Sequence, residues 1–134
     1  MKQTKLYIVL FAVALSTFAS CDKEELVGLW DRMEWKTDVP VKNDRVAVPA
    51  EGGTYRFECK NYWGLWISYV RADGEYVYRK SEEYHVITGE WYDVKAEGNV
   101  LEVVISPNEA NHRHELKVSV QEGNAFYTFW FDQV

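Results

Sequence analysis

Residues 46–61, VAVPAEGGTYRFECKN, contain the pattern that decides the fold. In its second half three apolar side chains alternate with three charged ones: Tyr55, Phe57 and Cys59 against Arg56, Glu58 and Lys60. Because successive side chains of a strand point to opposite faces, this alternation predicts a strand with one buried face. The Gly52-Gly53 pair before it can adopt positive φ at little cost and therefore predicts a turn.

Runs with the composition of β-strands continue on both sides of this stretch. They are rich in Val, Trp, Tyr, Phe and Thr and are separated by Gly, Asn, Asp and Pro. Candidate strands cover residues 29–36, 45–48, 54–60, 65–70, 75–79, 82–87, 90–95, 100–106, 112–121 and 125–133. Asp73-Gly74 and Gly98-Asn99 favour hairpin turns. The pattern predicts an all-β antiparallel sandwich or barrel of about seven to nine strands.

The beginning of the chain has the order of a bacterial export signal. A basic start, an apolar run and a small pair precede a cysteine: Lys2 and Lys5, residues 6–15, Ala19-Ser20 and Cys21. This order resembles a lipobox, in which the chain is cut before the cysteine and the thiol carries lipid. Residues 22–25 resemble the acidic export signal of Bacteroidetes surface lipoproteins. We therefore expect a signal peptide at 1–20, a tether at 21–28 with lipidated Cys21, a domain at 29–134, and an outer-membrane lipoprotein exposed at the cell surface.

Charge and cysteine content limit the partners. Cleavage would remove two of the 15 basic residues and leave 13 against 21 acidic ones, a formal charge of −8. With no basic stripe, the chain is not expected to bind nucleic acid. Once Cys21 carries lipid, Cys59 has no disulfide partner. Its place on the apolar face of a strand predicts a buried thiol that acts as a small hydrophobic side chain.

Several features, taken in order, resemble a BACON domain, a Bacteroidetes module with an immunoglobulin-like fold. The first is the strand-turn-strand pattern at 46–61, and the second is Trp91 at the start of a strand. The third is the segment 101–113, in which a strand is followed by a loop with Asn108 and by Arg113. The fourth is Gln133 at the end of the last strand. The resemblance spans about residues 40–134. It implies an antiparallel immunoglobulin-like β-sandwich and a carbohydrate-binding role. The segment from Tyr69 to Thr88 departs from the family in being longer and more aromatic.

A second resemblance points to a different fold. Gly28-Leu29-Trp30 is similar to the Gly-x-Trp opening of lipocalin-like barrels. That reading predicts a central cavity for a small apolar ligand, lined by Trp30 and Trp130.

Aromatic side chains are dense between residues 62 and 92. An aromatic ring can pack against the C–H face of a sugar, whereas small sandwiches also bury Trp and Tyr in their cores. Trp66 and Trp91 lie in expected strands and are expected in the core, while Tyr62 and Trp63 precede Gly64 in a loop and are expected to be exposed. The candidate ligand-binding residues are Tyr62, Trp63, Tyr76 and Tyr78.

Other candidate chemistry is weaker. His112 and His114 share one face of a strand and could supply half of a zinc site, but too few ligands lie nearby in sequence, so an exposed pair without metal is expected. Adjacent Glu82-Glu83 would point to opposite faces and are expected at a solvated edge. No nucleophile, zinc-protease or phosphate-loop motif occurs. We therefore expect no catalytic residue, no cofactor and no enzymatic activity.

The combined hypothesis is a non-catalytic surface lipoprotein that binds a polysaccharide or mucin glycan. The alternative is a structural spacer or protein-interaction module that pairs with an outer-membrane protein through an edge strand or an aromatic patch. The four candidate aromatic residues separate these readings. An exposed row with polar neighbours favours sugar, whereas burial of all four beside a flat open edge favours a protein partner.

Overall fold

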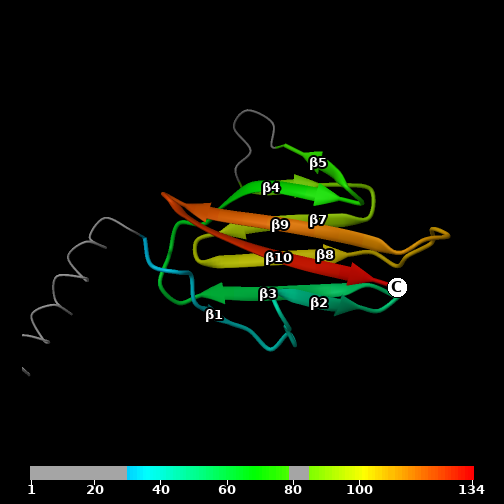
Figure 1. Ribbon diagram of the computed structural model, residues 1–134, viewed down its shortest axis with the longest axis horizontal. Helices are drawn as coiled ribbons and strands as arrows, with labels where there is room; N and C mark the ends of the chain where they lie inside the picture. The colour runs from blue at the N-terminus through cyan, green and yellow to red at the C-terminus, as the bar shows by residue number, and fades with distance from the viewer. Residues whose placement is uncertain (1–29, 79–84) are drawn as a thin grey trace, which may run out of the picture. The chain divides into compact units, whose positions relative to one another are not determined.

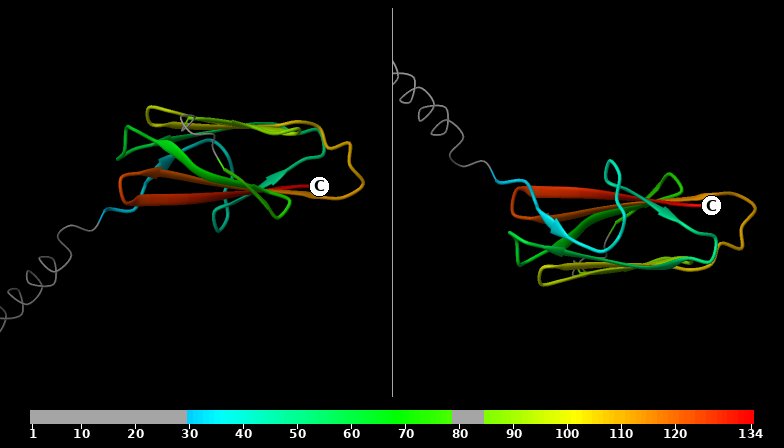
Figure 2. Two further views of the ribbon diagram at one scale, coloured as in Figure 1. Left: turned by 90° about the horizontal axis from the view of Figure 1, so that it is seen from above. Right: turned by 90° about the horizontal axis from the view of Figure 1, so that it is seen from below.

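Two five-stranded sheets pack face to face in the computed structural model, which describes residues 30–78 and 85–134 (Figure 1). The first sheet has the order β1 (Trp35–Lys36), β3 (Gly53–Cys59), β8 (Val100–Ile105), β7 (Tyr92–Glu97) and β6 (Val86–Thr88). The second has the order β2 (Arg45–Val48), β10 (Ala125–Gln133), β9 (His114–Glu122), β4 (Trp66–Ala72) and β5 (Glu75–Val77). Figure 2 shows them as two separate layers.

The strand order is that of an immunoglobulin-like sandwich, which confirms the expected fold class. In that fold strands A, B, E and D form one sheet and C, F and G form the other. Here β1, β3, β8 and β7 occupy the first set of positions, and β4, β9 and β10 occupy the second. Neighbouring strands are antiparallel except β2 and β10, which run parallel. The described part of the chain has ten strands because β1, β5 and β6 are short edge additions of two or three residues.

The core lies between the sheets, where the alternating residues of both meet. Buried and exposed positions alternate without interruption along β7, as the sequence pattern requires of a strand with one solvated face. Phe57 of β3 stacks on Phe129 of β10 with ring centres 4.3 Å apart, so the two sheets are joined by aromatic contact. Cys59 is fully buried beside them, which confirms its predicted environment.

The first expected strand is shorter than its sequence pattern suggests. Residues 29–36 alternate, yet only Trp35–Lys36 pairs with β3. The Asn61 side chain provides the reason. Its Oδ1 accepts the Glu34 N–H at 3.0 Å and its Nδ2 donates to the Arg32 carbonyl at 2.9 Å, so side-chain hydrogen bonds replace a ladder there.

The barrel alternative is wrong, because the sheets remain separate and each keeps its own edges. Trp130, which that reading placed inside, lies on the outer face of the second sheet and is half-buried. Residues 31–134 form one compact unit. The predicted signal peptide, tether and Cys21, together with Glu82-Glu83, lie outside the described residues. Within the described ranges no helix has the length and apolarity to cross a membrane.

Candidate functional site

The structure separates the four candidate aromatic residues. Tyr62 is buried, with 8% of its surface exposed, and its hydroxyl donates to the Asp31 carbonyl at 2.6 Å. Burial raises the pKa of this hydroxyl. The expectation that Tyr62 is exposed was wrong, because its loop folds back onto the segment before β1. Trp63, its neighbour, is 66% exposed as expected.

Tyr76 and Tyr78 lie together on and just after β5, far along the chain from Trp63. Both are exposed, and their rings are nearly parallel with centres 6.1 Å apart. Tyr69 of β4 extends this pair, since its ring centre lies 5.4 Å from that of Tyr76. Trp63 instead belongs to the connection between β3 and β4, at the start of β4, whereas Tyr76 pairs with Arg71 near its end.

The aromatic surface continues across the second sheet to β10. Lys117 of β9 places its Nζ 5.3 Å from the Tyr69 ring centre and 4.8 Å from the Trp130 ring centre. Arg45 covers Trp130 from the other side, with its Cζ 4.6 Å from the ring centre. Arg71 lies beside Tyr76 in the same manner, at 5.5 Å. Each contact is within the range of a cation–π interaction.

We call Tyr69, Tyr76, Tyr78 and Trp130 the aromatic row. It crosses β10, β9, β4 and β5, which corresponds to about 14 Å at the usual strand spacing. Polar groups accompany it, because Arg45 donates to both carboxylate oxygens of Asp132 at 2.9 and 3.1 Å. The row therefore offers ring faces for apolar C–H groups, with charged hydrogen-bonding side chains between and beside them.

Sequence reasoning found two members of the row and missed two. Tyr69 was counted in the dense aromatic region but not selected, and Trp130 was assigned to a barrel interior. The alternation in residues 125–133 does place Trp130 opposite the buried Phe129 and Phe131. The alternation does not predict the order of strands in the sheet, and it is this order that places β10 and β5 on one surface.

A second cluster lies at the end of the sandwich where β9 begins. An open groove of about 1240 Å³ runs there between the β4–β5 turn, the β6–β7 turn and the last residues of β10; we call it the end groove. Asp73, at the tip of the β4–β5 turn, accepts the Glu115 N–H at 2.8 Å and lies 2.6 Å from His114 Nδ1. The Asp73-Gly74 hairpin was predicted correctly, and both residues have positive φ.

The expectation of two exposed histidines was wrong for His114. Its side chain is 8% exposed and its ring stacks on Trp91, with centres 4.0 Å apart and planes within 9°. Trp91 is half-buried and packs against the core, which partly agrees with its expected place, and Trp66 is also half-buried. His112 is exposed, and its ring meets that of His114 edge-on at 5.1 Å.

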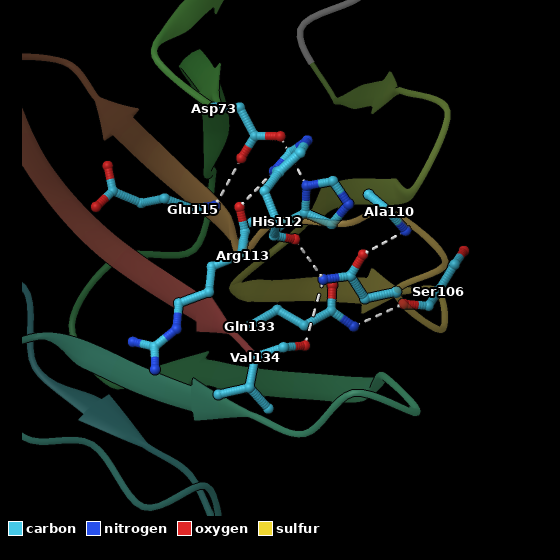
Figure 3. Close-up of polar contacts among 10 residues, drawn as sticks. Asp73, Ser106, Ala110, His112, Arg113, Glu115, Gln133 and Val134 are labelled. Atoms are coloured by element: carbon cyan, nitrogen blue, oxygen red, sulfur yellow. Dashed lines mark hydrogen bonds and ion pairs between the residues drawn. The ribbon is translucent and has the colours of Figure 1, made fainter.

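Hydrogen bonds hold the loop that carries His112. Asn108 donates from Nδ2 to the His112 carbonyl at 2.9 Å and to the Val134 carbonyl at 3.3 Å. Its Oδ1 accepts the Ala110 N–H at 2.9 Å (Figure 3). Gln133 donates to the Ser106 carbonyl at 2.9 Å, where this loop leaves β8. The start of the loop is therefore tied to Gln133 and Val134, and Asn108 links His112 to the same place.

Comparison with known proteins gives one strong similarity. A protein from Bacteroides thetaiotaomicron, known from an NMR structure, shares 43% sequence identity over 80% of this chain and 90% of its own, with a TM-score of 0.69. Titin domains M7 and M4 match at 6% and 11% identity over 78% of this chain and 96% of each domain, with TM-scores of 0.45 and 0.40. No family model and no curated protein match the chain.

Proposed function

This chain belongs to the same family as the Bacteroides thetaiotaomicron protein, and from that premise we propose that it is a non-catalytic, glycan-binding lipoprotein of the Bacteroidetes cell surface. The aromatic row is the proposed binding surface. The BACON-like order of motifs in the sequence supports the same class of ligand.

The observation that carries this proposal is the alternation of rings and cations across one sheet. Sugar rings have an apolar C–H face that packs on an aromatic ring, and hydroxyls that need polar partners beside it. Tyr76 and Tyr78 are 49% and 72% exposed, so they can receive such a ring without rearrangement of the core. At about 14 Å the row suits several sugar units of a polysaccharide or mucin glycan, and a single monosaccharide would leave most of it uncovered.

The edges of the sheets favour this surface over pairing with a partner strand. The described edge strands β1, β2, β5 and β6 contain two to four residues each. Short edges offer few unpaired backbone groups for another chain to extend. A protein partner would therefore bind side chains on a surface of the sandwich rather than extend one of these edges.

Electrophoresis through gels that contain a polysaccharide tests the proposal. We expect plant polysaccharides, glycosaminoglycans or mucin to include at least one that retards the protein. Tyr76→Ala should weaken that binding about tenfold, because truncating a central contact residue costs about 1–2 kcal/mol. Retardation at graded polysaccharide concentrations gives the apparent affinity of each variant.

Two other exposed aromatic residues provide matched controls. Phe126 is 55% exposed on the same face of β10 but lies outside the row, and Trp63 is 66% exposed in the β3–β4 connection. Phe126→Ala and Trp63→Ala should bind as the unmodified protein does. Loss of retardation in the Trp63 variant, with Tyr76→Ala unaffected, would contradict the aromatic row and place the glycan-binding site at Trp63. No retardation by any glycan would instead favour the protein-interaction module.

Lipid attachment is a separate prediction. Cells grown with labelled palmitate should incorporate label into the protein, and Cys21→Ser should abolish it because the thiol is the acceptor. Cys59→Ser is the control, since this buried thiol should make no contribution. Label that persists in the Cys21 variant would contradict the anchor. The surface location is tested by replacing residues 23–25 with alanine, which should protect the protein from protease added to whole cells.

A further inference from the structure

We propose that Asp73, His112 and His114 bind a divalent transition-metal ion at the mouth of the end groove. One possible ligand atom from each residue lies within 4.8 Å of the others. Two imidazole nitrogens and one carboxylate oxygen form a set that suits Zn²⁺, with water completing the coordination from the open groove. This site is distinct from the aromatic row and does not depend on glycan binding.

Small movements bring the three ligands to coordination distance. In a tetrahedral site with bonds of about 2.0 Å, ligand atoms lie about 3.3 Å apart. Asp73 Oδ2 and His114 Nδ1 are 2.6 Å apart, so they must separate by less than 1 Å to admit an ion between them. The metal would then take the place of the proton on His114 Nδ1, and the ring would carry its proton on Nε2.

A hydrogen bond at Nδ1 determines which nitrogen of His112 is left for a metal. Its Nδ1 lies 2.8 Å from the Arg113 carbonyl, as expected for an N–H that donates to it. Figure 3 shows the ring beside the Asp73 carboxylate. A backbone carbonyl on Nδ1 is a common outer-shell partner of metal-binding histidines, because it fixes the tautomer and leaves the Nε2 lone pair for the metal.

The other two ligands are held as firmly. His114 is buried against Trp91, and Asp73 is fixed by the Glu115 N–H at 2.8 Å. Its backbone N–H also donates to the Glu115 carbonyl at 2.9 Å. These contacts keep the carboxylate next to the imidazoles before any ion arrives. Such preorganisation is what an effective metal site requires of its surroundings.

The charge of the groove favours a cation. Among the described residues that line it are five carboxylates and one guanidinium: Asp73, Glu75, Glu90, Glu115 and Asp132 against Arg113. Arg45, outside the lining, pairs with Asp132 and lies 3.7 Å from Glu115, which leaves the carboxylates of Asp73, Glu75 and Glu90 facing one guanidinium. Charge of one sign along a cleft raises the local concentration of the opposite ion. The ligand set, with two nitrogens, prefers a transition metal over Ca²⁺ or Mg²⁺, which take oxygen ligands.

Titration calorimetry with ZnCl₂ on tag-free, chelator-treated full-length protein tests the proposal. We expect one Zn²⁺ per chain. His112→Ala removes an exposed ligand without disturbing the core. Loss of a residue that only supports a ligand typically weakens metal binding about 10- to 100-fold, so loss of a ligand itself should weaken Zn²⁺ binding by no less than that. A rise of the melting temperature with Zn²⁺ should accompany binding in the unmodified protein and disappear in this variant.

His85 provides the matched control. It is also exposed, and its Nδ1 likewise lies 2.9 Å from a backbone carbonyl, that of Ala96. His85→Ala should bind Zn²⁺ as the unmodified protein does. NMR of the imidazole groups should show Zn²⁺-dependent shifts for His112 and His114 and none for His85. Absence of stoichiometric binding, or equal affinity in His112→Ala, would overturn the proposal.

Discussion

Gly52→Ala is expected to lower the free energy of unfolding by about 2–5 kcal/mol. Gly52 has φ of +80°, where an alanine costs about 1–2 kcal/mol. A Cβ at this position would also overlap the Ile105 carbonyl oxygen and approach the Ser106 carbonyl carbon to 2.7 Å. These are backbone atoms at the end of β8, so relief requires the sheet to move, which adds about 1–3 kcal/mol. Urea denaturation followed by tryptophan fluorescence measures the loss.

Gly74→Ala separates the two causes of destabilisation in Gly52→Ala, the positive φ and the steric overlap of the added Cβ. Gly74 has a similar φ of +86°, but a Cβ there would meet only the Arg71 guanidinium, at 4.0 Å. This variant should therefore lose only about 1–2 kcal/mol, the cost of the left-handed conformation. Equal losses in the two variants would mean that the approach of the β2–β3 turn to β8 does not constrain the fold.

Local patterns predicted the elements of this fold well. β2 and β10 begin and end at the residues that their alternation indicated, and the turn at residues 50–53 and the Asp73-Gly74 hairpin form where glycine and aspartate favour them. Such features depend on neighbours in sequence. The first strand is shorter than expected, because Asn61 satisfies its backbone from 27 to 29 residues away. Nothing in residues 29–36 reveals that competition. The strands expected at 90–95 and 112–121 begin and end one or two residues later, at Tyr92–Glu97 and His114–Glu122.

The candidate sites could be predicted only in part, because they depend on strand order. Lys117 and Trp130 become neighbours of Tyr69 through pairing of β9 with both β10 and β4. Tyr62 was misplaced for a related reason, since the carbonyl that its hydroxyl reaches lies 31 residues earlier. In both cases the residue types were visible in sequence, while the partners that decide exposure were not.

The histidine cluster shows the same limit more sharply. His112 and His114 were recognised as a pair on one strand face, and the missing third ligand decided against a metal. That ligand is Asp73, 41 residues before His114 in the chain. Its sequence context predicts a tight turn, and the turn is what exposes its carboxylate at the start of β9. Asp73, which favours the tight turn, thus also supplies a carboxylate to the end groove.

Gln133→Ala is expected to lower the free energy of unfolding by about 3 kcal/mol. The Gln133 side chain is 1% exposed, and its Nε2 donates to the Ser106, Pro49 and Ala50 carbonyls at 2.9, 3.2 and 3.3 Å. Truncation leaves the Ser106 carbonyl oxygen without this donor, at about 1–3 kcal/mol, and opens space where the side chain packed. The Pro49 and Ala50 carbonyls keep the Gly52 and Asn108 N–H groups, at 3.0 and 2.7 Å. Denaturant unfolding measures the total.

Gln121→Ala is the matched control, because it removes the same amide from a position where the side chain bonds only within its own turn. Gln121 is half-buried, and its Nε2 donates to the Gly123 carbonyl within the same turn, so its loss should cost less than about 1 kcal/mol. Hydrogen exchange should separate the two variants further. Because Gln133 anchors Ser106, and Asn108 ties His112 to Val134, the Gln133 variant should exchange faster across residues 106–112. Unchanged protection there would mean that the end groove keeps its geometry without this clamp.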